Sequence, residues 1–242
     1  MTKRGSSSSE EVISILATLG VAPTSLCRDK SALPILLSRS PASLFRLVAF
    51  LSSDAVRMPV NRIGPLFRRS ECASLLDYVA PLSNRQTLDS SIIFNDLLNG
   101  ENNEMVTEIT RRYTMMFKTA KYLRRVVGMN DLGRSVSAYA NILTLDVEKQ
   151  IEPCITFLSD EIGLYEEEIS SVLELYPQLL GENISKMRQN VEYLRSLEVM
   201  EEDICSIFRA FPALLTLEVS SMTEVVKFLK DIGVTNIGRF VT

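Results

Sequence analysis

The sequence predicts an all-α protein in which helical hairpins repeat about every 35 residues. Leu194-Arg-Ser-Leu197-Glu-Val199 recurs 35 residues later as Leu229-Lys-Asp-Ile232-Gly-Val234. A Pro-x-Leu-Leu motif follows three such segments at one constant distance. The chain has only 10 glycines and 9 prolines in 242 residues, which disfavours a β-sandwich or barrel with its many tight turns.

The repeat is defined by a hinge and by a proline motif. The hinge also occurs as Leu16-Ala-Thr-Leu19-Gly-Val21, and as Leu158 to Leu164 with one extra residue. Thirteen residues after the last hinge residue come Pro34-Ile-Leu-Leu37, Pro177-Gln-Leu-Leu180 and Pro212-Ala-Leu-Leu215. We therefore expect the three prolines at equivalent points of three units. We also expect Leu179 and Leu214 in the core between stacked units.

Each part of a unit has a physical reason. Val191, Leu194 and Leu197 have helical spacing and form one apolar stripe. The hinge ends that helix, and glycine there, as at Gly233, tolerates the left-handed conformation that commonly closes a helix. The next helix opens with acids, as at Glu201 to Asp203, which favour the positive end of the helix dipole. Proline then ends this second helix, as at Phe211-Pro212.

The middle of the chain carries a weaker form of the repeat. Val56 lies 35 residues after Val21, so we expect a hinge at Leu51 to Val56 and Arg69 where the proline would fall. Residues 121–129 resemble another unit start, and Ala140-Asn-Ile142-Leu143 occupies the proline segment without its proline. We expect one helical-repeat domain over residues 10–242, with clear repeats at 12–60 and 150–242 and degenerate repeats at 61–149.

The two ends of the chain are atypical. Residues 1–9 are basic and serine-rich and lack the apolar segment of a secretory signal. They are typical of a disordered tail or a cloning junction, with a remnant of an organellar transit peptide as the alternative. Val234 begins a unit whose Pro-x-Leu-Leu motif is missing, so the last repeat is unfinished. We expect the natural protein to continue past Thr242, or a partner to pack there.

The sequence lacks the motifs of an enzyme. It contains no histidine, no phosphate loop, no nucleophile elbow and no dinucleotide-binding glycine motif. The four cysteines are far apart, which predicts reduced thiols and no metal site. The acids at 166–168 and 201–203 recur at equivalent helix starts, which indicates a structural role. We expect no catalytic residues, no cofactor, no small-molecule substrate and no membrane span.

Charge is distributed unevenly along the chain. Residues 1–130 carry 17 Lys+Arg and 11 Asp+Glu, a net +6, whereas residues 131–242 carry 9 and 19, a net −10. The sum is the overall −4. Opposite charges in the two halves predict two surfaces with different partners.

The strongest basic candidate is the segment from Glu104 to Gly128. An apolar stripe is formed by Ile109, Tyr113, Met116, Ala120, Leu123 and Val127. Arg111, Lys118 and Arg125 are seven residues apart on the opposite face, with Lys121 beside them. Such a row can follow a phosphate backbone and release its counterions. The alternative is a solvated face whose terminal charges complement the helix dipole.

A second basic cluster comprises Arg57, Arg62, Arg68 and Arg69. Two of these arginines stand where the unit lost its proline. They either bind phosphate or pair with acids from the C-terminal half in a partner subunit.

The hinge followed by Pro-x-Leu-Leu resembles the repeat of the mTERF family, the organellar transcription-termination-factor repeats. The tetratricopeptide signature relies on Trp, and this chain has none. The resemblance covers residues 12–60 and about 150–242. It implies a curved α-solenoid of about six mTERF-type repeats that binds duplex DNA or RNA in the plastid stroma or mitochondrial matrix. It also implies a role in organellar transcription, including its termination, or in transcript maturation.

Two functions remain open on the sequence alone. The inherited fold and the basic half favour a nucleic-acid-binding regulator. The acidic half and the pI of about 5.2 favour a protein-interaction scaffold in a large complex such as a ribosome or polymerase assembly. In either case we expect a protein partner on the acidic C-terminal half.

Overall fold

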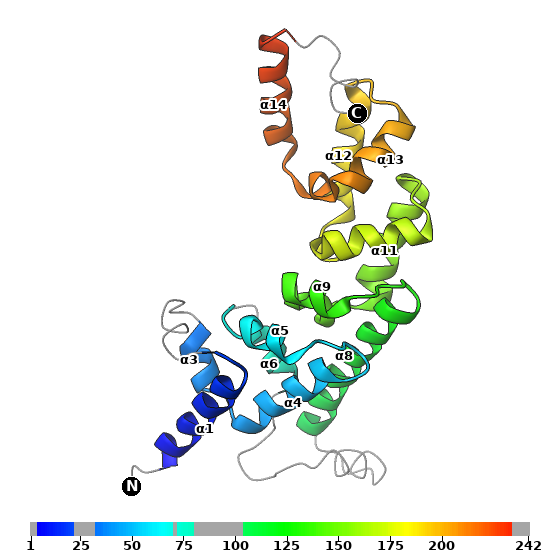
Figure 1. Ribbon diagram of the computed structural model, residues 1–242. Helices are drawn as coiled ribbons and strands as arrows, with labels where there is room; N and C mark the ends of the chain where they lie inside the picture. Colours follow the sequence, from blue (N-terminus) through cyan, green and yellow to red (C-terminus); the bar gives the residue numbers. More distant parts are fainter. Residues whose placement is uncertain (1–3, 22–31, 70–71, 80–103, 234–242) are drawn as a thin grey trace. The chain divides into compact units, whose positions relative to one another are not determined.

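The computed structural model describes residues 4–21, 32–69, 72–79 and 104–233, and all regular secondary structure in those ranges is helical (Figure 1). The chain divides into two compact units. Unit 1 comprises Met1–Arg124 and Asp131–Thr144, and unit 2 comprises Arg125–Asn130 and Leu145–Thr242. This division differs from the single domain expected over residues 10–242, and its boundary falls inside the degenerate repeats.

Unit 1 is built from seven labelled α-helices and one 3-10 helix. They are α1 (Arg4–Thr18), α3 (Ala32–Leu37), α4 (Pro41–Ser52), α5 (Val60–Leu66), α6 (Cys72–Val79), α8 (Glu104–Arg125), α9 (Leu132–Ala138) and the 3-10 helix η1 (Ala140–Thr144). The last residue of α8 belongs to unit 2. Because α1 begins at Arg4, residues 4–9 are helical where a disordered tail was expected; they extend a helix anchored by buried Val12, Ile15 and Leu16.

Unit 2 contains two complete repeats after an irregular first helix. That helix is formed by the π-helical turn η2 (Val147–Ile151), α10 (Glu152–Thr156) and the π-helical turn η3 (Phe157–Glu161). The first repeat is α11 (Glu166–Leu175), the 3-10 helix η4 (Pro177–Gly181) and α12 (Ile184–Ser196). The second is α13 (Glu201–Ala210), the 3-10 helix η5 (Pro212–Thr216) and α14 (Val219–Asp231). Each repeat therefore has a 3-10 helix between its two α-helices, which the predicted hairpin lacked.

Pro177 and Pro212 occupy the same structural position. Each is buried and opens a 3-10 helix, and the residue before each has a similar backbone, φ −138° and ψ 75° at Tyr176 and φ −133° and ψ 66° at Phe211. Tyr139 has the same conformation (φ −142°, ψ 90°) before Ala140, which opens η1 without a proline. The predicted equivalence of Pro177 and Pro212 is confirmed, and so is the proline segment at residues 140–143.

Pro34 differs from the other two prolines. It is exposed and is the third residue of α3, which begins at Ala32. A proline is tolerated in the first helical turn because the N–H it lacks has no partner within the helix there. The expectation that all three prolines are equivalent was therefore wrong for Pro34.

Left-handed residues mark the hinges. The described glycines with positive φ are Gly20, Gly128, Gly163 and Gly233, and the described non-glycine residues are Arg57 and Glu198. Positions 128, 163, 198 and 233 are spaced by 35 residues each. In chain order, each left-handed residue from Gly20 to Glu198 is followed by a buried residue. These five buried residues are Val21, Met58, Met129, Leu164 and Val199. A left-handed residue followed by a buried apolar one is the helix-closing arrangement that the repeat predicted.

The hinge hydrogen bonds explain the one irregular spacing. The amide of Val21 donates to Leu16 O at 2.9 Å and that of Val199 to Leu194 O at 3.3 Å, each five residues back. The amide of Leu164 instead reaches six residues back, to Leu158 O at 3.0 Å. The π-helical turn η3, which contains Leu158, accommodates the extra residue seen in the sequence.

The second hinge lies two residues later than the sequence predicted. Arg57 is the left-handed residue (φ 57°), so Met58 and not Val56 corresponds to Val21. The expected proline position is then residue 71, which lies outside the described residues, and Arg69 does not occupy it. Arginine at the left-handed position hid this hinge, because the sequence offers no glycine there.

The long interval from Arg57 to Gly128 contains residues 80–103, which lie outside the described part of the chain. Within unit 1, α5 packs directly on α9, and a Cβ added at Gly133 would lie 3.1 Å from the Cα of Met58. The number of about six repeats stays a prediction.

Candidate nucleic-acid interface

α8 buries one face and exposes a cationic one. Met116, Ala120 and Leu123 of the predicted stripe are fully buried. Tyr113 is partly exposed and makes an edge-on ring contact with Phe50, with 5.6 Å between the ring centroids. Burial raises the pKa of the Tyr113 hydroxyl. Val127 lies beyond the helix end, and the side chain of Ile109 lies outside the described residues.

The exposed side of α8 carries the four predicted cations. Arg111, Lys118, Lys121 and Arg125 are all exposed, and Thr114 is exposed between the first two. From Arg111 to Lys121 the helix rises about 15 Å, at about 1.5 Å per residue. That length matches about four base-pair steps of about 3.4 Å each. The spacing of basic residues does not point to Thr114, whose hydroxyl can also donate to a phosphate oxygen.

The other two arginines of α8 have packing roles. The Arg112 guanidinium lies over the ring of Tyr78 in α6, 5.8 Å from its centroid. Arg124 Nη1 donates to the carbonyl of Asp54, just after α4, at 2.6 Å. Both side chains are half-buried. They hold α8 against α6 and the end of α4 within unit 1.

The exposed cations also have contacts within the chain. Lys121 Nζ lies 4.4 Å from the centroid of the Phe117 ring, a cation–π contact at the edge of the exposed face. Arg111 and Lys118 each take part in an interaction within the chain as well. Between residues 109 and 125 the chain has six cationic residues and no carboxylate, so the face is strongly positive.

The second basic cluster does not form one surface. Arg62 Nη1 donates to both carboxylate oxygens of Asp131, at 2.9 and 3.0 Å. Arg69 Nη1 donates to the carbonyls of Ser137 and Ala138, at 2.5 and 3.4 Å. These two arginines therefore hold the two ends of α9. Pairing with an acid of a partner subunit was one of the two alternatives for this cluster; the pairing of Arg62 occurs instead within one unit of the same chain.

Asp131 links this contact to the start of α9. As the N-cap it accepts a hydrogen bond from the amide of Arg134 at 3.0 Å. The hydrogen bond from Arg62 lowers the pKa of its carboxyl group, so the carboxylate is ionised at neutral pH. Arg62, Arg69 and Arg134 all line a shallow groove along α5 and α9. Arg134 was not predicted from the sequence, because it has no basic neighbour in the chain.

Arg57 and Arg68 are the remaining members of the cluster. Both are exposed. Arg57 forms the hinge, and its Nε lies 3.3 Å from the Asp54 carboxylate in a solvent-exposed ion pair. An exposed pair of this kind contributes little to stability and leaves the guanidinium accessible.

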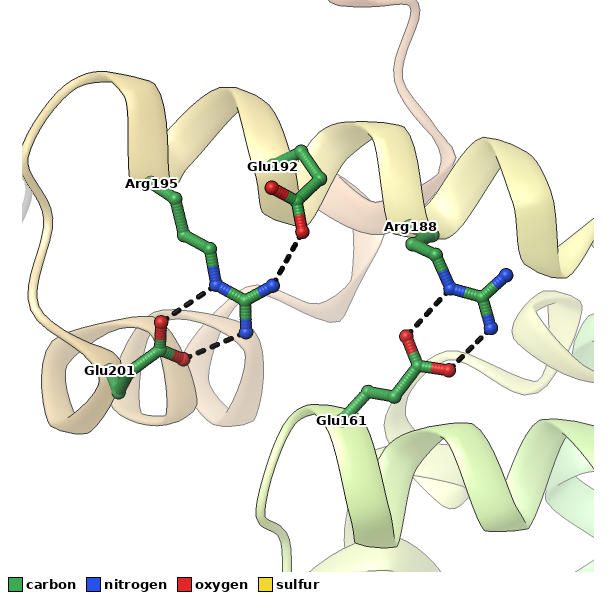
Figure 2. A network of polar contacts seen from close by, with 5 residues as sticks. All are labelled: Glu161, Arg188, Glu192, Arg195 and Glu201. Carbon is green, nitrogen blue, oxygen red and sulfur yellow. Dashed lines mark hydrogen bonds and ion pairs between the residues drawn. The ribbon is translucent and has the colours of Figure 1, made fainter.

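Several acids of unit 2 form ion pairs, most of them between helices. Figure 2 shows the Glu161 carboxylate paired with Arg188, and Arg195 between Glu192 and Glu201. Arg209 Nη1 donates to Glu168 at 2.6 Å, which joins α13 to α11. Hydrogen bonds from these arginines, and from the Tyr165 amide in the case of Glu168, lower the pKa of Glu161, Glu168 and Glu201. Ionised, paired carboxylates stabilise helix starts and contacts and are unsuited to proton transfer.

The remaining polar groups show no reactive centre in the described residues. Their Cys, Asp and Glu side chains nowhere form a group of three suited to a metal ion. None of their helices is long and apolar enough to span a membrane. Cys154 is a buried free thiol whose pKa burial raises to about 12, and Cys205 is a partly exposed free thiol with a raised pKa. Neither thiol has the lowered pKa of a reactive cysteine.

The comparison with known families agrees with this architecture. The mTERF family model matches residues 2–237, nearly the whole chain. No individually curated protein matches the chain. mTERF proteins are helical-repeat, nucleic-acid-binding proteins that are typically organellar. The chain belongs to the mTERF family.

Proposed function

We propose that this mTERF protein binds duplex DNA or RNA through the exposed cationic face of α8 and thereby regulates organellar transcription or transcript maturation. One observation carries the proposal: Arg111, Lys118, Lys121 and Arg125 are exposed on a single helix that has no carboxylate beyond Glu108. Phosphates attract such a row without regard to base sequence.

The second cluster plays a smaller part in this proposal. Arg57 and Arg68 are exposed and available to a phosphate. Arg62 and Arg69 already hold the ends of α9, so using them for phosphate would cost those contacts. Arg134 lies in the same groove and is the better third candidate.

A binding assay tests the proposal. The full chain is titrated into fluorescent duplex DNA, duplex RNA and single-stranded RNA at about 50 and 200 mM salt. We expect binding to at least one duplex that weakens strongly with salt. Failure to bind any duplex at low salt would contradict the proposal.

A second function is favoured by the charge of unit 2. Unit 2 has 9 Lys+Arg and 18 Asp+Glu, a net charge of −9, which repels phosphate. The alternative is therefore a scaffold in a large organellar complex, in which this acidic half contacts protein. A chain that binds no nucleic acid but co-purifies stoichiometrically with an organellar assembly would support the alternative.

A further inference from the structure

α14 exposes a continuous apolar face. Val225, Phe228 and Ile232 are 58%, 61% and 61% exposed, and they follow one another at helical spacing. The first two lie in α14, and Ile232 is its C-cap residue. On the other side of α14, Met222 is buried and Val226 and Leu229 are half-buried. Three large apolar side chains in a row on one helix face are typical of a surface that another element covers.

The preceding repeat shows what such a face normally contacts. The equivalent positions on α12, 35 residues earlier, are Asn190, Tyr193 and Leu197, and none of them is exposed. α12 packs against the 3-10 helix η5 of the next repeat. Asn190 Nδ2 donates to the carbonyls of Leu214, Leu215 and Leu217 at 3.1, 2.8 and 2.9 Å. The contact between repeats thus joins a side-chain donor to three carbonyls at the 3-10 turn, of which that of Leu214 also accepts from the Leu217 amide at 3.4 Å.

α14 lacks this donor. At the position of Asn190 it has Val225, whereas one repeat earlier the corresponding Cys154 Sγ contacts the Leu179 carbonyl at 3.6 Å. A 3-10 turn placed on Val225 would bury carbonyl groups without a hydrogen-bond partner, which is costly. The α14 face therefore fits an element that satisfies its own backbone and offers side chains only. An α-helix does so.

Charged residues beside the apolar face of α14 indicate which kind of partner helix fits it. With about 100° between successive residues, Glu224 and Asp231 lie together along one flank of the Val225–Phe228–Ile232 row. Both acids are exposed, and Lys227, also exposed, lies beyond them and farther from the row. The other flank is formed by Met222 and Leu229 on the packed side of α14. In an antiparallel pair of α14 helices from two copies these acidic flanks would face each other and repel. Lysines or arginines on a partner helix would instead pair with them.

We propose that the apolar face of α14 is the docking surface for an amphipathic helix of another protein, with lysines or arginines beside its apolar stripe. The proposal does not depend on nucleic-acid binding, because none of the residues it uses is among the cations of α8. The three apolar residues anchor the partner helix, and Glu224 and Asp231 set its charge.

A model peptide tests the proposal on the full chain. The probe is a synthetic leucine–lysine amphipathic helix, and its counterpart has glutamate in place of lysine. We expect the lysine peptide to bind saturably with one site and the glutamate peptide to bind at least roughly tenfold more weakly. Phe228→Ser and Val225→Ser should each weaken lysine-peptide binding by roughly tenfold or more. Phe45→Ser on α4 is the matched control, because Phe45 is also 60% exposed, and it should bind like wild type.

Each other outcome overturns the proposal. Lysine-peptide binding that survives both serine variants would be non-specific charge attraction. Equal binding of the two peptides would show that Glu224 and Asp231 do not determine the charge of the partner helix. A wild-type dimer in sedimentation that Phe228→Ser converts to monomer would make a second copy the occupant. Circular dichroism checks that each variant is folded.

Discussion

Arg195 and Glu201 form a two-point ion pair across the hinge between α12 and α13, with Nε to Oε1 at 2.7 Å and Nη2 to Oε2 at 2.9 Å (Figure 2). Arg195 also contacts Glu192 one turn earlier in α12 at 2.6 Å. The guanidinium therefore joins the last turn of one helix to the first turn of the next. Between them Glu198 has the left-handed conformation that turns the chain.

We expect unit 2 to lose stability in acid. The folded pKa of Glu201, Glu168 and Glu161 is lowered by hydrogen bonds, from Arg195, from the Tyr165 amide and Arg209, and from Arg188 respectively. A lowered folded pKa means that the stabilising contribution is present above the unfolded value, near 4.3, and is lost as pH falls through the folded pKa. Chemical unfolding from pH 7 to pH 3 should show this loss.

Glu201→Gln should reduce that pH dependence and cost about 1 kcal/mol or less at pH 7, because Glu201 is largely exposed and solvent screens the pair. Glu202→Gln, one residue further in the same helical turn, is the control and should leave the acid transition unchanged. An acid transition identical in wild type and Glu201→Gln would contradict the role of the pair.

Replacing the hinge residue Glu198 by glycine should stabilise the protein. A left-handed conformation costs an L-residue about 1–2 kcal/mol, so Glu198→Gly should raise the free energy of unfolding by about 0.5–1 kcal/mol, after the entropy that glycine loses. The same change at Glu202, inside α13, should lower it by roughly 1 kcal/mol. Thermal melts of the two variants decide the point; destabilisation by Glu198→Gly equal to that by Glu202→Gly would refute it.

The two equivalent leucines should respond unequally to truncation. Leu179 in η4 is fully buried, whereas Leu214 in η5 is partly exposed, which corrects the expectation that both are core residues. Leu179→Ala should cost roughly 2–5 kcal/mol, and Leu214→Ala clearly less. Denaturant titrations of both variants measure the difference, and equal costs would contradict the burial described here.

Much of unit 2 was predictable because its repeats preserve their signals. Glycine or a single left-handed residue recurs every 35 positions, and Pro177 and Pro212 open equivalent 3-10 helices. The 3-10 geometry itself was not predictable, because Pro-x-Leu-Leu says where a helix ends and not how the next turn is wound. The partial exposure of Leu214 depends on which elements pack on its repeat. Sequence periodicity gives no information about these elements.

The candidate site was predicted unevenly for a related reason. The choice among the cations of α8 followed from helical periodicity, which places Arg112 and Arg124 on the sides of the helix and the other four outward. Arg62 pairs with Asp131, which is 69 residues away in the chain, so local spacing does not reveal this contact. Long-range pairs of this kind require the tertiary structure.

The salt dependence of binding to a duplex tests the central claim most directly. Four phosphate contacts by Arg111, Lys118, Lys121 and Arg125 predict a log–log slope of about −3.6, at about −0.9 per contact. The variant Arg111→Glu/Lys118→Glu/Lys121→Glu should lower the slope by about three contacts and weaken binding to all sequences alike. The control variant Lys149→Glu/Lys227→Glu/Lys230→Glu has the same change in net charge, at exposed positions of unit 2.

The account predicts near-wild-type binding and slope for the unit 2 variant, and a shallow slope with weak binding for the α8 variant. Equal losses in the two variants would mean that net charge alone governs binding. A wild-type slope retained by the α8 variant would mean that the phosphate contacts lie elsewhere, and either result would contradict α8 as the nucleic-acid interface.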